Sequence, residues 1–213
     1  MAGGLWNEAS LCQCEHHEVG AGFKPAPADW PSMQELSLHI LDVAENGIIA
    51  GADLIEIVVR EDTKEDSLDI TIRDNGRGME PEFLAKVLDP FVTTRTTRSV
   101  GLGLSLFQQT AQAAEGDLSI ESTPGRGTRV RVSMRHGHID RKPLGDMAGT
   151  ITTLIEGNPL VDFVYSHWKD EKDYLLDTRE IRAELEEVPL NNPEVIRLIH
   201  DNVVAGLDEI GPG

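Results

Sequence analysis

The sequence predicts an α+β fold in which helices cover one face of a mixed or antiparallel sheet. Two segments, 68–74 and 128–134, alternate apolar with polar residues, which is typical of half-buried strands. Leu36, Ile40 and Val43 recur instead at the spacing of an amphipathic helix. Because helical and strand patterns follow one another along the chain, we expect a two-layer sandwich of helices on a sheet.

Seven elements are expected in the first part of the chain. A helix, two strands and a short helix precede a loop rich in polar and basic residues, and a second long helix and two strands follow it. Their expected ranges are 33–50, 53–60, 67–74, 80–88, 102–115, 117–122 and 127–134.

The part after residue 140 is acidic but patterned. Residues 161–168 and 173–178 are expected to pair as a hairpin, and helices are expected at 178–187 and 194–207. Pro193 suits the first turn of the last helix. This part of the chain either binds a partner or extends the sheet.

We therefore divide the chain into a flexible N-terminal arm at 1–31, a central domain at 32–138, and an acidic C-terminal extension of unknown function at 139–213. Met33 lies at the start of the central domain, so the native chain could start there.

Composition narrows the class of protein. No apolar run is long enough to span a membrane, and Cys12 and Cys14 are too close in the chain to bridge easily. The formal net charge of -18 disfavours a nucleic-acid backbone as a partner. We expect a cytoplasmic protein that binds neither membrane nor nucleic acid.

The segment Asp74-Asn-Gly-Arg-Gly-Met79 places an acid at the end of a strand, followed by two glycines. A carboxylate there can accept a hydrogen bond from an exocyclic amine, and so can select adenine over guanine. The glycines permit backbone angles and close approaches that side chains would forbid. By itself, the pattern also fits an ordinary turn between a strand and a loop.

A second polar pair lies on the first helix. Asp42 and Asn46 are four residues apart and share a face, and His39 lies three residues before Asp42. Carboxylate and amide oxygens suit Mg²⁺. The alternative is an exposed polar stripe.

A third segment, Val100-Gly-Leu-Gly-Leu, opens an apolar helix. The free N–H groups at such a helix start can bind an anion, and Arg95 and Arg98 lie just before it, where they could close over a triphosphate. Packing alone also explains many glycine pairs of this kind.

Together, these segments resemble the ATP-binding domain shared by DNA gyrase, Hsp90, histidine kinases and MutL, known as the Bergerat fold or GHKL superfamily. The resemblance covers about residues 33–136 and implies ATP and Mg²⁺ as cofactors. It implies that Asn46 binds Mg²⁺, that Asp74 accepts the adenine amine, and that Thr128 assists Asp74 through water. The cofactor-binding residues that it implies are Asn46, Asp74, Gly76, Gly78, Met79, Phe91, Thr94, Arg95, Arg98, Gly101, Leu102, Gly103, Leu104 and Thr128.

Two features depart from the family pattern. Hydrolysing members carry a catalytic Glu four residues before the metal-binding Asn, and here that position is Asp42, which is one methylene shorter. Many histidine kinases have a further Gly-Thr where this chain has Ser99-Val100. The lid between Thr93 and Val100 is short, as in the kinases.

The resemblance implies ATP-dependent phosphotransfer, with Asp42 as the catalytic base and a partner protein supplying the acceptor in trans in a bacterial-type signalling system. Whether the chain is a kinase-like enzyme or a slow ATPase stays open. The alternative is a weakly hydrolysing, nucleotide-gated regulatory module of the anti-sigma type. A clamp like MutL or Hsp90 fits the short lid less well, and a homodimer stays open.

Overall fold

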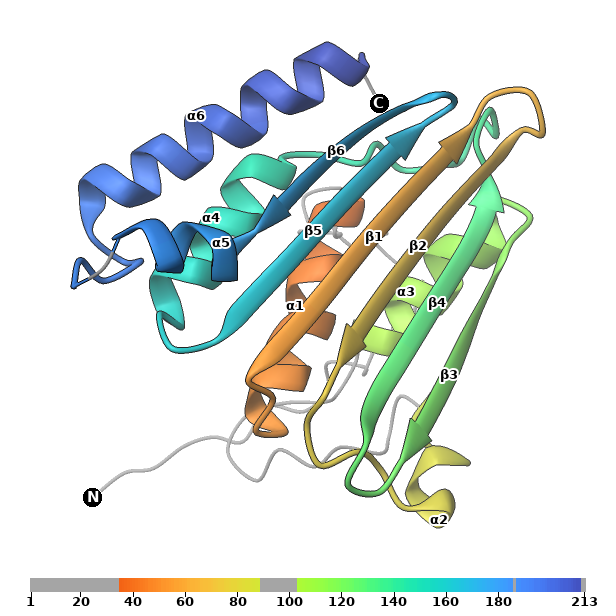
Figure 1. The fold of residues 1–213 in the computed structure, drawn as a ribbon. Helices are drawn as coiled ribbons and strands as arrows, with labels where there is room; N and C mark the ends of the chain where they lie inside the picture. The colour runs from red at the N-terminus through yellow and green to blue at the C-terminus, as the bar shows by residue number, and fades with distance from the viewer. Residues whose placement is uncertain (1–34, 89–102, 186, 212–213) are drawn as a thin grey trace, which may run out of the picture. The chain divides into compact units, whose positions relative to one another are not determined.

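A six-stranded mixed sheet organises the residues that the computed structural model describes, namely 35–88, 103–185 and 187–211. The strand order is β3-β4-β2-β1-β5-β6 (Figure 1). Neighbouring strands are antiparallel except β1 and β5, which are parallel. The predicted α+β fold with a mixed sheet is thereby confirmed. The strands are β1 Leu54–Asp62, β2 Ser67–Asp74, β3 Asp117–Thr123, β4 Gly127–Arg135, β5 Asp162–Lys169 and β6 Lys172–Asp177.

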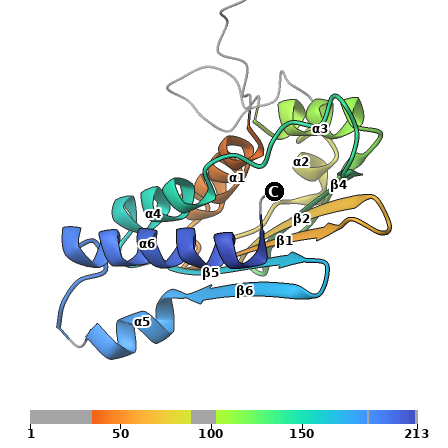
Figure 2. The same cartoon turned by 90° about the horizontal axis from the view of Figure 1, so that it is seen from above.

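The long helices lie over one face of this sheet (Figure 2). Helices α1 (Leu36–Ile49), α3 (Gly103–Ala113) and α4 (Met147–Gly157) form the layer, and α6 (Pro193–Ile210) packs beside α4. The short α2 (Pro81–Leu84) and α5 (Thr178–Leu185) follow β2 and β6 in the chain.

The core lies between the helices and the sheet. Alternate residues of β1, including Ile55, Ile57 and Val59, are buried and meet Leu36 and Ile40 of α1 in one apolar cluster. This alternation is why the strands were predictable, because residues of period two bury one face only. Burial of these side chains supplies the main driving force for folding.

One predicted helix is shorter in the structure, and one helix of the structure was not predicted. The helix predicted at 80–88 is helical only over Pro81–Leu84, and residues 85–88 form turns. No residue of α2 itself is fully buried, so little tertiary packing supports this short helix. Helix α4 was not predicted, although the Asp146 side chain accepts the Gly149 N–H at its start.

The C-terminal part of the chain extends the sheet. Strand β5 pairs with β1 in parallel, from Leu54 opposite Asp162 to Glu61 opposite Lys169, and β6 adds an outer strand. Of the two roles considered for this part of the chain, the structure shows that it extends the sheet.

A buried carboxylate on β1 bonds to a histidine of β5, and so joins the first four strands to the C-terminal strands. Glu61 of β1 is 3% exposed, and its two oxygens lie 2.7 Å from His167 Nε2 and 2.8 Å from His136 Nε2. The other ring nitrogen of His167 lies 2.9 Å from the Tyr165 hydroxyl. Burial raises the pKa of Glu61, but hydrogen bonds from His167 and His136 outweigh it and lower the pKa to about 2.

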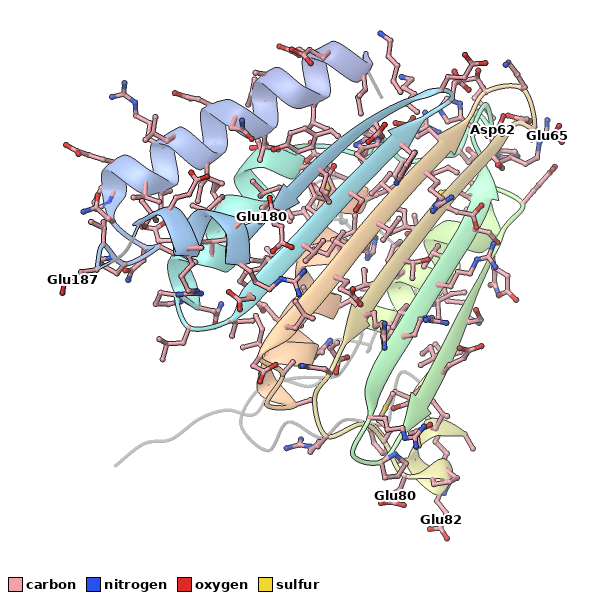
Figure 3. The ribbon with its side chains drawn as sticks, in the orientation of Figure 1. Asp62, Glu65, Glu80, Glu82, Glu180 and Glu187 are labelled. Atoms are coloured by element: carbon pink, nitrogen blue, oxygen red, sulfur yellow. The ribbon has the colours of Figure 1, made fainter. Side chains whose placement is uncertain are left out.

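The chain has a formal net charge of -18, and some of its acidic side chains lie at the ends of the sheet. Asp62 and Glu65 lie at the β1–β2 turn, whereas Glu80 and Glu82 lie at α2, at the opposite end of the sheet (Figure 3). A net negative charge of this size repels polyanions.

In the described residues, no helix combines the length and the apolar character needed to cross a membrane.

Candidate nucleotide-binding site

Asp74 ends β2 on the face of the sheet that the helices cover. Its register partner on β4 is Thr128, so the two side chains share that face. Asp74 Oδ1 accepts the Gly76 N–H at 2.8 Å. Burial raises the pKa of the Asp74 carboxyl, and the backbone N–H groups of Gly76 and Thr128 partly oppose this. The result is a half-buried carboxylate with one oxygen already bound to the backbone.

Helix α1 approaches Asp74 through a glycine. A Cβ on Gly47 would lie 2.8 Å from Asp74 Cβ and 2.8 Å from Ile55 Cδ1. Real Cβ atoms do not come that close, so a side chain at position 47 would push the helix away from the strand. Gly47 was not among the predicted site residues. Its signal was a glycine inside a helical pattern, which costs about 1 kcal/mol and therefore suggests a packing reason.

The loop after Asp74 is held against neighbouring segments. Asn75 Oδ1 accepts the N–H groups of Asp53 and Leu54 at 3.0 and 3.1 Å, which ties the loop to the start of β1. Gly78 has φ +67° and Gly127 has φ +90°, and a Cβ on either would overlap backbone atoms of a facing segment. The predicted role of Gly78 in shaping the floor of the site fits this close packing.

Asp42, Asn46 and Gly103 come together where α1 meets the start of α3. The Asn46 side-chain amide lies 3.4 Å from Asp42 Oδ2, and a Cβ on Gly103 would overlap the Asp42 carboxylate. The predicted base and metal ligand, both on α1, therefore lie beside the predicted phosphate-binding glycine of another motif. An Asp and an Asn side by side suit Mg²⁺, which takes few protein ligands and completes its shell with phosphate oxygens and water.

His39 does not join this polar group. Its ring is 1% exposed, stacks on Phe107 at 4.8 Å between centroids, and has Nε2 3.2 Å from Thr110 Oγ1. Among the described residues, its Nδ1 has no hydrogen-bond partner. Burial lowers the pKa of His39 to about 4, so His39 is a neutral residue that joins α1 to α3.

The free energy of unfolding should therefore fall by about 2 kcal/mol between about pH 7.5 and about pH 5. The folded-state pKa of His39 is about 4 and its ordinary value is 6.5, so in this window mainly the unfolded chain binds the proton. The contribution of neutral His39 to the free energy of unfolding is complete above pH 6.5 and is lost as the pH falls toward 4. Urea unfolding of the wild type and of His39→Leu at both pH values measures this. A variant with the same pH dependence as the wild type would contradict it.

The remaining predicted residues divide into two groups. Met79 donates its N–H to Ser122 Oγ at 2.8 Å, and Leu104 is half-buried against the core. The others lie outside the described residues: Phe91, Thr94, Arg95, Arg98, Gly101 and Leu102.

Comparisons with known proteins identify the family of the residues that form this site. Residues 33–138 match the model of the histidine kinase-, DNA gyrase B- and HSP90-like ATPase family. These residues form a domain of that family. The predicted family resemblance is confirmed, and membership in this ATPase family implies ATP binding.

The relatives of this ATPase domain include bacterial sensor kinases. The sensor protein kinase FleS of Pseudomonas aeruginosa is 42% identical over 89 residues, which are 42% of this chain and 22% of that protein. The signal transduction histidine-protein kinase AtoS of Escherichia coli is 34% identical over 111 residues, 52% of this chain and 18% of that protein. A putative sensor protein of Shewanella frigidimarina is 29% identical over 123 residues, 56% and 19% respectively. The chain thus spans about a fifth of the length of these relatives.

Ser122 is another residue of the ATPase domain that the sequence did not suggest. It lies opposite Thr128 in the β3–β4 pair and contacts Met79, which is 43 residues away. A single serine in an alternating strand belongs to no recognisable motif. The contact with Met79 is therefore visible only in the structure, where the strands are paired.

Proposed function

We propose that this chain binds Mg-ATP between α1 and the end of β2, and passes the γ-phosphoryl group to a partner protein in a bacterial-type signalling or regulatory system. The observation that carries the proposal is Asp74. One oxygen of its carboxylate is held by the Gly76 N–H, and the glycine at position 47 lets α1 approach it. Such a fixed acceptor fits the amine of adenine.

The side chains at the start of α3 fit the phosphate end of this site. We assign Asn46 as the Mg²⁺ ligand and the glycine-opened start of α3 as the phosphate contact. When bound, Mg-ATP supplies the phosphoryl group and most of the charge neutralisation. Asp42 accepts the proton of the attacking group, because it is the carboxylate beside Asn46.

The environment of the histidines favours an acceptor supplied in trans. Among the described residues, His39 is buried, and the Nε2 atoms of His136 and His167 are bonded to the Glu61 carboxylate. His138 lies 3.7 Å from a carboxylate of Glu115. His200 is the most exposed of the five and is the residue to test as an acceptor within the chain.

A second candidate is a nucleotide-gated regulator that hydrolyses ATP weakly. It is favoured by the surroundings of Asp42, which lies against Gly103 and within 3.4 Å of the Asn46 amide. A short side chain held in this way reaches less far toward a phosphate than a glutamate would.

Incubation with γ-labelled ATP and Mg²⁺ distinguishes the two candidates. Label on the chain or on an added acceptor protein supports phosphotransfer, and free phosphate alone supports an ATPase. Bound ATP without either product supports the regulator.

If the chain transfers phosphate or hydrolyses ATP, Asp42→Asn should reduce turnover at least about a hundredfold, because it removes the catalytic base. It should change ATP affinity less than about threefold, because asparagine keeps the shape of the aspartate side chain. Glu45→Gln is the matched control, since Glu45 is exposed on the same helix and should leave turnover unchanged. Equal turnover in Asp42→Asn and the wild type would exclude Asp42 as the base.

A further inference from the structure

Ser122 joins three segments around the proposed adenine position. Its Oγ lies 2.8 Å from the Met79 nitrogen, 3.0 Å from the Gly127 carbonyl oxygen and 2.9 Å from Thr128 Oγ1. One hydroxyl therefore links the loop after Asp74, the β3–β4 turn and the threonine that faces Asp74 across the strands.

Counting protons fixes the direction of each bond. A serine hydroxyl has one proton to donate and two lone pairs to accept with. The Met79 N–H can only donate to it, and the Gly127 carbonyl can only accept from it. One lone pair remains, so all three contacts are satisfied together only when Thr128 donates its proton to Ser122.

A hydroxyl that has given its proton to Ser122 offers only lone pairs elsewhere. Thr128 then acts as an acceptor, on the same face as the Asp74 carboxylate, which is also an acceptor. Adenine carries an amine at its 6-position, whereas hypoxanthine and guanine carry a 6-oxo group, which is itself an acceptor.

We propose that Ser122 is a positioning residue that makes Thr128 a hydrogen-bond acceptor, and that the site thereby selects 6-amino over 6-oxo purine nucleotides. This proposal rests on the proposed function, because it concerns the same site. Without Ser122 Oγ, the Thr128 hydroxyl can rotate and donate to a 6-oxo group.

The test measures dissociation constants of Mg-ATP and Mg-ITP by calorimetry, since ITP carries the 6-oxo group in place of the amine. Ser122→Ala should lower the preference for ATP over ITP about tenfold, because the Thr128 proton is released. Ser122→Thr keeps the hydroxyl and should retain the wild-type preference within about twofold. Thermal melting of each variant shows that it is folded.

A double-mutant cycle separates this role from a general structural one. Thr128→Val should lower the preference by itself, and adding Ser122→Ala should then have no further effect. Equal weakening of both nucleotides in Ser122→Ala, or additive effects in the double variant, would overturn the proposal. If Ser122→Ala does not fold, an unchanged preference in Thr128→Val overturns it by itself.

The wild type separates this proposal from the proposed function. A wild-type chain that binds neither nucleotide overturns both. A wild-type chain that prefers ATP and keeps that preference in Ser122→Ala overturns only the role of Ser122.

Discussion

Asp74→Asn should lower the affinity for Mg-ATP at least about a hundredfold. The Gly76 N–H occupies Asp74 Oδ1, so an asparagine must keep its carbonyl oxygen there. Its NH₂ group then takes the place of the second carboxylate oxygen and faces the adenine amine, donor against donor. Calorimetry with Mg-ATP measures the loss.

Stability and a matched control keep this result interpretable. Burial raises the pKa of Asp74, so the folded state disfavours its charge, and the neutral asparagine should leave the protein at least as stable. Asp69→Asn changes the same strand on the opposite face, where Asp69 pairs with Arg131 at 2.9 Å. Its ATP affinity should equal that of the wild type. If Asp74→Asn also retains affinity within about threefold, the adenine position assigned here is wrong.

Glu61→Ala should lower the free energy of unfolding by about 3–5 kcal/mol, and the melting temperature by roughly 10 °C. The change leaves His136 and His167 without their shared carboxylate in a region where His167 is only 3% exposed. The low pKa of Glu61, about 2, shows that the folded state favours its charged form. Chemical denaturation at neutral pH measures the loss.

Glu56→Ala is the matched control for this network. Glu56 lies on the same strand but on the other face, where its bond to Arg73 is 3.2 Å long and solvent-exposed. Exposed pairs contribute about 0–1 kcal/mol, so this variant should lose little. Similar losses in the two variants would mean that the buried network contributes no more than a surface ion pair. Glu61→Gln, which keeps the shape without the charge, should fall between them.

Strand positions were predictable wherever one face of a strand is buried. Strand β2 was predicted at 67–74 and has those bounds in the structure, because its apolar and polar residues alternate without interruption. Helix α4 shows the opposite case. Its three threonines and two glycines have low helix propensity, and it is stabilised by burying Met147, Ile151 and Leu154 against neighbouring helices.

The candidate site was predictable only where it consists of local motifs. Asp74 and the two glycines after it stand within five residues, so the sequence displays them together. The contacts of Ser122 and Glu61 join positions that are far apart in the chain: Met79 with Ser122, and Glu61 with His136 and His167. No periodicity encodes such pairs, because they depend on which strands become neighbours.

Strand β1 pairs with β2 of the ATPase domain on one side and with β5 of the C-terminal part on the other. The match to the ATPase family ends at residue 138, but the sheet does not end there, since β5 and β6 lie beyond it. A fragment that stops at residue 138 would expose one long edge of β1 and uncover Glu61, which is then left without His167. Exposed strand edges pair readily with other chains. The unit that can be produced and studied by itself is therefore longer than the unit defined by family resemblance.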